Sequence, residues 1–324
     1  LVSRQTDLYC AQMDRGSTKA KVHTKPAKSL RRFHYIVPIL VVTASFISAI
    51  VVQRLSSGNS PPASKEPVPT VVANAGPVAV RAYAFLMSKD LAGEPLDVLV
   101  LDFVGRRFGI DTLRSFTSRA VENLIDEEGP NKLYVRLVLP ASKLPERVRS
   151  APLPTLEAAG SIVYYPVVAL NCDRFPLQPA FLDGLRSEAP KGGYRSTHSA
   201  LALLWGYEQG CIDRTSTTDL YNEHLRVLSE TIATESFPGD LYVEALALYE
   251  FMSEEPVPES ILDRVAQVQL EDGSIPYSRS EPMGSTHATT LALWAALEHS
   301  DPERSPDGWI VAPGPPAGPP LVQR

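Results

Sequence analysis

Three segments in the C-terminal half of the chain share one order of apolar and polar positions. Each is a run of Leu, Ala and aromatic residues with few charges, and the three runs are 196–205, 240–249 and 285–294. Their gapless alignment gives two columns that repeat every 44 or 45 residues, namely His198, Tyr242 and His287, and Trp205, Tyr249 and Trp294. This composition predicts helices that are buried on most faces. Each run begins with a residue type that favours helix N-caps, and these are Ser196, Asp240 and Ser285.

Amphipathic stretches lie before each of these runs. Residues 179–189, 219–235 and 259–270 carry apolar side chains at three- and four-residue steps, with charges between them. The repeat unit is therefore an outer amphipathic helix, a Gly/Pro turn and an inner buried helix. A period of about 45 residues built from helix pairs indicates a solenoid or a closed helical ring.

The pattern is weaker upstream. Residues 78–88, 96–108 and 111–127 are plausible helices, whereas 132–139 and 161–170 are rich in Val and Tyr and also fit strands. We expect all five to be helical. The predicted fold class is therefore all-α, with about five helical hairpins between residues 76 and 300.

The stretch 267–297 resembles the repeat of the terpenoid cyclase and protein prenyltransferase superfamily. That repeat joins a Gln shortly before Asp-Gly-Ser to a Thr-rich helix start and a Leu-Ala-Leu helix. The matching residues here are Gln269, Asp272, Gly273, Ser274, Thr286, Leu291, Ala292 and Leu293. The resemblance covers about residues 177–299. It implies an α/α toroid, in which inner helices line a central cavity and outer helices face solvent.

The chain departs from the superfamily in its chemistry. It has no Asp-x-Asp-Asp run and no Cys-Gly-Glu-Gln run. Asp213, Cys211 and His287 are of the types that bind zinc in prenyltransferases, but their order and spacing differ from the Asp-x-Cys pattern. The resemblance thus implies a fold and no activity. Because no Cys-x-x-Cys or His-x₃-His spacing occurs either, we assign no metal ligand.

The N-terminal segment differs from the rest of the chain in its net charge. Residues 1–34 hold eight Lys and Arg against two Asp, a net charge of +6, which leaves −12 for the rest of a chain whose total is −6. The uncharged stretch 35–52 follows, and as a helix it would span roughly 27 Å. We expect a single-pass transmembrane helix with a cytoplasmic N-terminal segment and an extracytoplasmic remainder. The alternative is a cleaved signal peptide.

Two Pro-rich segments flank the predicted domain. Residues 53–75 are expected to form a Pro/Ser-rich linker, and residues 301–324 a disordered Pro/Gly-rich tail, because neither can bury enough apolar surface. Cys172 and Cys211 then lie outside the cytoplasm, 39 residues or about one repeat apart. Equivalent ends of neighbouring helices could approach within disulfide distance. The alternative is two buried free thiols.

If the ring closes, the helix starts bring several polar side chains together. The candidate catalytic residues are His198, His287, Tyr242 and Glu244, and the candidate ligand-binding residues are Tyr194, Arg195, Asp240, Tyr277 and Arg279. This set has a base, an acid and cations, which suit acid–base chemistry, anion binding or one divalent metal. The alternative is that both His side chains only pack. We expect the aromatic column and the Asp272-Gly273-Ser274 turn to be structural.

The leading functional hypothesis is an envelope protein that binds or scaffolds a peptide or glycan. The second is a lyase or hydrolase acting on an extracytoplasmic polymer, with His198 or His287 as base and Tyr242 or Glu244 as its partner. The third is a purely structural ring. The membrane is an expected partner. A domain of net charge −12 would repel phosphate backbones, which argues against nucleic acid.

Overall fold

The fold was analysed in a computed structural model, which describes residues 67–253, 255–301, 308–311, 313 and 318–322. The chain divides into two compact units, Leu1–Ala63 and Ser64–Arg324, and all described residues belong to the second. The expected basic segment 1–34 and transmembrane helix 35–52 lie outside the described residues. Among the residues that are described, no helix has both the length and the apolar composition needed to cross a bilayer.

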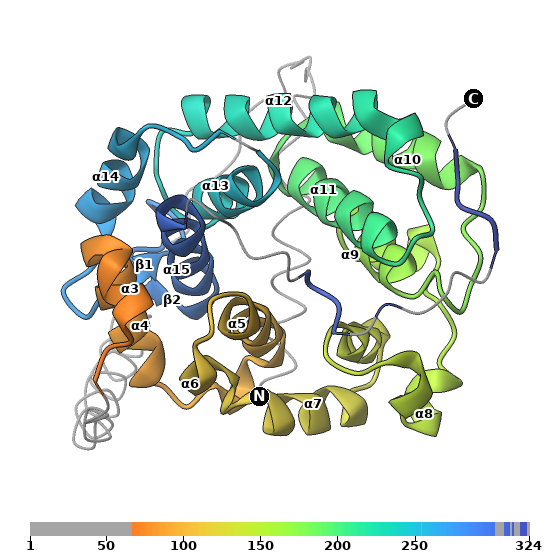
Figure 1. The fold of residues 1–324 in the computed structure, drawn as a ribbon, viewed down its shortest axis with the longest axis horizontal. Helices are drawn as coiled ribbons and strands as arrows, with labels where there is room; N and C mark the ends of the chain where they lie inside the picture. The colour runs from red at the N-terminus through yellow and green to blue at the C-terminus, as the bar shows by residue number, and fades with distance from the viewer. Residues whose placement is uncertain (1–66, 254, 302–307, 312, 314–317, 323–324) are drawn as a thin grey trace, which may run out of the picture. The chain divides into compact units, whose positions relative to one another are not determined.

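The described unit is all-α apart from one two-residue strand pair, β1 (Ile275–Pro276) and β2 (Gly284–Ser285) (Figure 1). Its α-helices are α3 (Thr70–Asn74), α4 (Gly76–Met87), α5 (Pro95–Arg107), α6 (Asp111–Arg114), α7 (Thr117–Asp126), α8 (Glu146–Arg149), α9 (Leu156–Leu170), α10 (Ala180–Glu188), α11 (Gly193–Glu208), α12 (Thr218–Thr234), α13 (Asp240–Met252), α14 (Glu259–Val268) and α15 (Thr286–Ser300). Its 3₁₀ helices are η2 (Leu91–Gly93), η3 (Pro130–Leu137), η4 (Ala141–Lys143), η5 (Ala189–Lys191) and η6 (Thr215–Thr217).

The helical predictions are confirmed. The repeating buried runs are α11, α13 and α15, and the amphipathic stretches before them are α10, α12 and α14. Upstream, the ambiguous stretch 161–170 is the second part of α9, and 132–139 falls mostly in the 3₁₀ run η3. The expected helix 111–127 is divided into α6 and α7.

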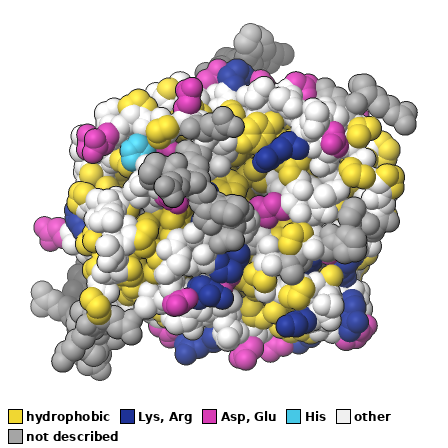
Figure 2. All heavy atoms as spheres, in the orientation of Figure 1, with side chains coloured by type: hydrophobic (Ala, Val, Ile, Leu, Met, Phe, Trp, Pro, Cys, Tyr) yellow, Lys and Arg dark blue, Asp and Glu magenta, His cyan; other side chains and the backbone are white. Residues whose placement is uncertain are grey.

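Six elements pack on one another in a closed order. The order is α5, η3, α9, α11, α13 and α15, and α15 packs on α5 again. We call this set the inner ring. Helices α4, α7, α10, α12 and α14 pack on the outside of its members (Figure 1). On the face shown in Figure 2, charged side chains gather mainly around the periphery, with hydrophobic side chains between them.

The Asp272-Gly273-Ser274 turn ties the last hairpin to the first helices, as expected of a structural turn. Asp272 accepts hydrogen bonds from the backbone and side chain of Ser274, and the Gln269 amide donates to the carbonyls of Gly273 and Val78. Gly273 has φ +90°, and a Cβ there would lie 2.2 Å from the carbonyl oxygen of Arg81. Only glycine fits this approach.

One of the three expected N-caps is confirmed. Ser285 caps α15 by accepting a hydrogen bond from the backbone of Ala288. The expectation for Ser196 and Asp240 is wrong, because Gly192 and Gly239 occupy the N-cap positions of α11 and α13. Glycine is also tolerated at this position, so these two helices begin without a side-chain cap.

Both flanks of the domain differ from the prediction. Residues 70–74, expected in the linker, form α3, and Val72 is fully buried against the core. In the segment expected to be a disordered tail, Trp309 and Ile310 are 2% and 5% exposed. The composition of these segments is polar on average, but Val72, Trp309 and Ile310 are apolar anchors, and burial of such side chains offsets the cost of ordering a short segment.

A disulfide joins Cys172 and Cys211, whose Cα atoms are 6.3 Å apart. The two residues follow the C-terminal ends of α9 and α11, which are neighbours in the inner ring. The bond therefore links equivalent ends of two successive inner helices.

A buried histidine on α12 gives a pH-dependent stability. His224 is fully buried, its Nδ1 donates to the carbonyl of Leu220, and its Nε2 lies 2.7 Å from the hydroxyl of Ser199. Burial lowers its pKa to about 4, against weaker raising effects of the Leu220 bond and Glu223. The unfolded chain binds this proton near pH 6.5, so the stabilisation is complete above pH 6.5 and is lost as the pH falls toward 4.

We expect the free energy of unfolding of the wild type to fall by roughly 3 kcal/mol more than that of His224→Gln between pH 6.5 and pH 4. Urea denaturation at a series of pH values measures this difference. A gap between the two proteins that stays constant over the range would contradict a neutral His224.

Candidate functional site

The N-terminal ends of four inner-ring helices meet at one end of the ring. His287 is the second residue of α15, Asp240 the first of α13, Tyr194 the second of α11, and Asp97 the third of α5. Glu244 lies one turn after Asp240 on the same face of α13. Residues far apart in sequence are thus brought together because these helices run in the same direction.

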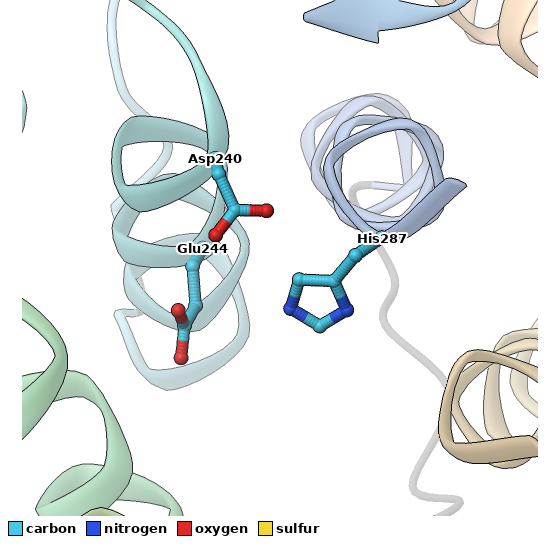
Figure 3. A group of neighbouring side chains, drawn as sticks. All are labelled: Asp240, Glu244 and His287. Atoms are coloured by element: carbon cyan, nitrogen blue, oxygen red, sulfur yellow. The ribbon is translucent and has the colours of Figure 1, made fainter. Parts of the chain in front are cut away.

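A short hydrogen bond joins His287 to Asp97. The Nδ1 of His287 donates to Oδ1 of Asp97 at 2.6 Å, and Asp97 is 6% exposed. The other ring nitrogen of His287 faces Asp240 and Glu244 (Figure 3). Sequence reasoning missed Asp97, whose one signal is that it is an acidic residue in the first turn of α5, between apolar neighbours.

Asp240 and Glu244 are buried carboxylates with unused oxygens. Asp240 is 1% exposed and accepts a 2.6 Å hydrogen bond from the Tyr194 hydroxyl, which lies 3.2 Å from that of Tyr277. Glu244 is 3% exposed. Among the described residues, neither Oδ1 of Asp240 nor Oε2 of Glu244 has a hydrogen-bond partner. A buried carboxylate oxygen without a partner carries a large desolvation penalty.

His198 lies beside Glu244. Its Nδ1 donates to the carbonyl of Ile162 on α9 at 2.8 Å, and its Nε2 is 3.4 Å from Oε1 of Glu244. Burial lowers the pKa of His198 to about 4, against a raising effect of the Ile162 bond and with a smaller lowering effect of the nearby charge of His287. The ring is therefore neutral at pH 7, and its contact with Glu244 is not an ion pair.

The carboxylates near His287 determine the direction in which its pKa is shifted. Burial alone would lower its pKa, but Asp240, Asp97 and Glu244 outweigh this effect and raise the pKa to about 10. Burial raises the pKa of Glu244 to about 7, and the charge of Asp240 acts in the same direction. The pKa of Asp240 is likewise raised by burial. Three carboxyl groups, those of Asp97, Asp240 and Glu244, therefore share the site with one charged imidazole, that of His287.

Three expected site residues lie elsewhere. The hydroxyl of Tyr242 donates to the carbonyl of Ile261 on the outer helix α14, and Arg264 covers its ring at 4.7 Å. Arg195 is exposed and pairs with Glu188, and Arg279 is exposed beside the ring of Phe237. The expectation that these three join the site is wrong. His198, His287, Glu244, Asp240, Tyr194 and Tyr277 do come together.

Asp240, Glu244 and His287 each offer a ligand atom, and these atoms lie within 4.8 Å of one another. Two carboxylate oxygens and one imidazole nitrogen are a donor set that suits Zn²⁺ or Mn²⁺. The sequence search for metal motifs missed this group because its members come from two helices rather than from one short spacing.

A surface pocket of about 280 Å³ lies at a different place. It is bounded by α12 and by the Gly192-Gly193 turn, with Arg226, Glu230 and Leu241 among its lining residues. Arg226 and Glu230 pair with each other along α12, and none of the clustered carboxylates or imidazoles lines the pocket. The candidate site is therefore the group of carboxylates and imidazoles at the N-terminal ends of the inner-ring helices.

Comparisons with protein-family models, with curated proteins and with solved structures found no match to this chain.

The site predicts that a conservative substitution of Glu244 stabilises the protein when no cation is added. Glu244→Gln keeps the shape of the side chain but removes a buried negative charge that faces Asp240. We expect the free energy of unfolding at pH 7.5, with a chelator present, to rise by about 1 kcal/mol. Urea denaturation measures it. A loss of stability would instead identify the cluster as a structural network whose charges stabilise the fold.

Proposed function

We propose that the folded unit is an α/α toroid that holds a divalent metal ion at the N-terminal end of its inner ring and binds a peptide or glycan there. The observation that carries the proposal is the group of ligand atoms from Asp240, Glu244 and His287 within 4.8 Å of one another, on two buried carboxylates that each keep one oxygen without a partner among the described residues. Buried carboxylates are normally paired or bound to metal, and a cation at this place would pair with both carboxylates.

The contact between His287 and Asp97 supports the metal site. A metal-binding His commonly donates its second ring N–H to a carboxylate, which fixes the ring and makes the ligand nitrogen more basic. Nδ1 of His287 makes such a bond to Asp97, and Nε2, which faces Asp240 and Glu244 (Figure 3), would be the ligand nitrogen once a metal displaces its proton. Three protein ligands leave coordination positions for water or for a ligand group.

The closed order of the inner ring supports the toroid assignment, together with the repeat resemblance around Gln269 and Asp272-Gly273-Ser274. The disulfide between Cys172 and Cys211 supports an oxidising, extracytoplasmic location, because such bonds persist there. The basic segment 1–34 before the uncharged stretch 35–52 supports a single-pass anchor. On this proposal, the protein presents its ring outside the membrane that anchors it.

A lyase or hydrolase is the second candidate function. The observation that favours it is the placing of neutral His198 and the Tyr194 hydroxyl against the two carboxylates. With a metal bound, a coordinated water would have a base and a proton donor within reach. Glu244, and not Tyr242, would be the partner of the histidine base, because Tyr242 faces α14.

Metal binding tests the proposal directly. We expect the full chain, purified in detergent and freed of metal, to bind one Zn²⁺ in isothermal titration calorimetry at pH 7.5. His287→Gln and Asp240→Asn should each weaken binding by about 100-fold or more, since each removes a ligand atom. Asp97→Asn should weaken it by about 10–100-fold, as expected when the partner of a ligating His is lost.

His299 supplies the matched control. It lies on the same helix as His287 and also contacts a buried carboxylate, Glu250, at 2.9 Å, but at the other end of α15. His299→Gln should leave Zn²⁺ affinity unchanged. Absence of binding to the wild type, or equal losses in His287→Gln and His299→Gln, would overturn the metal site.

A further inference from the structure

A second site lies at the C-terminal end of the inner ring, and the chain's own residues 308–311 occupy it. In Figure 1 this segment is dark blue and lies within the circle formed by the inner-ring helices. Its contacts come from the last two turns of α5 and α11 and from the middle of α15. The carboxylate and imidazole cluster lies at the opposite ends of the same helices.

Two ring side chains recognise the backbone of the segment. The carboxylate of Glu208 accepts the N–H groups of Trp309 and Ile310, at 3.1 and 3.0 Å. The guanidinium of Arg106 donates to the carbonyls of Gly308 and Trp309, at 3.0 and 2.7 Å. Recognition of main-chain groups by fixed side chains is how many proteins bind extended peptides.

An aromatic pocket receives the side chain of Trp309. Its indole stacks on Phe103 with ring centroids 4.0 Å apart, and it meets Trp294 edge-on at 5.0 Å and Trp205 at 5.8 Å. These walls come from α5, α15 and α11, and Trp309 is 2% exposed. A buried aromatic anchor of this kind commonly provides most of the affinity of a peptide.

The residue before the anchor is restricted in size. A Cβ on Gly308 would lie 2.8 Å from the carboxylate carbon of Glu208, the group that holds the next two amides. After the anchor, the N–H of Val311 donates to the carbonyl of Leu137 at the end of η3. The site therefore selects a glycine, then a tryptophan, then one aliphatic residue, Ile310, which is 5% exposed.

The segment resembles a ligand more than a part of the ring. The inner ring closes through helix contacts that do not include residues 308–311. The segment adds no helix or sheet partner at this place, and the indole N–H of Trp309 has no hydrogen-bond partner among the described residues. Its release would leave each surrounding helix complete.

We propose that this end of the inner ring is a peptide-binding site for extended segments of the type Gly-Trp-aliphatic. Residues 308–311 fill the site within the same chain, and a partner protein that carries such a segment displaces them. The site is independent of the metal site proposed at the other end of the ring.

The test uses the full chain and a fluorescently labelled peptide with the sequence of residues 308–313, Gly-Trp-Ile-Val-Ala-Pro. Gly308→Ala weakens the docking of the internal segment without changing the ring. We expect this variant to bind the peptide at least 10-fold more tightly than the wild type in fluorescence anisotropy. Glu208→Gln added to Gly308→Ala should reduce that affinity about 10-fold, and a peptide with Ala in place of Trp should not bind.

Val322→Ala is the matched control, because Val322 lies in the same C-terminal segment but is 54% exposed and outside the site. It should bind the peptide no better than the wild type. If Gly308→Ala binds no peptide while it keeps its helical circular dichroism, the proposal is wrong. If it loses that signal, residues 308–311 are an integral part of the core and the proposal is equally wrong.

Hydrogen exchange of the unmodified protein gives a second measurement. The amides of Trp309 and Ile310 should exchange at least 10-fold faster than the slowest amides of α13, because the segment opens without unfolding of the ring. Excess peptide should increase their exchange further by capturing the open site. Exchange of these two amides together with α13, unaffected by peptide, would overturn the proposal. A dimer in light scattering, in which a second copy supplies the segment, would overturn the occupation of the site within one chain.

Discussion

The ion pair between Arg107 and Glu298 joins the first and last helices of the inner ring, and the rest of the structure depends on this closure. Nε and Nη2 of Arg107 donate to the two oxygens of Glu298 at 2.6 and 2.9 Å, and both side chains are 5% exposed or less. The indole of Trp294 donates to the same carboxylate. Burial of two charges is costly, but a bidentate pair with an additional donor offsets that cost and fixes the register of α5 against α15.

Closure with one helix direction gives the ring two chemically different ends. Because α5, α11, α13 and α15 are parallel, residues near their starts meet at one end and residues near their ends meet at the other. Asp97, Asp240 and His287 share the first end, and Arg106 and Glu208 share the second. Side chains that are far apart in the sequence are thus brought together in two clusters, one at each end of the ring. No single hairpin contains all the residues of either cluster.

The sequence was sufficient for the helices and for part of the site, and geometry explains what it missed. Asp240 and Glu244 are one turn apart and share a face of α13, so Tyr242, two residues or about 200° from either, must point away from them. The sequence alignment placed Tyr242 in one column with the two histidines, so it did not show that the Tyr242 side chain points away from the site. Asp97 has no counterpart in any column because α5 lies outside the detectable repeat. Trp309 was missed because average composition does not reveal a single apolar anchor in a Pro-rich segment.

The dipoles of the parallel helices explain part of the charge at the two ends of the ring, and Glu208 departs from this rule. Helix N-termini favour carboxylates, which suits Asp97 and Asp240, and C-termini favour cations, which suits Arg106 on α5. Glu208 is the last residue of α11, where its charge is disfavoured, and burial raises its pKa further. The N–H groups of Trp309 and Ile310 compensate this charge, and the nearby charges of Arg106 and Arg107 act in the same direction. A carboxylate placed at an unfavourable helix end is therefore stabilised by the C-terminal segment that it holds.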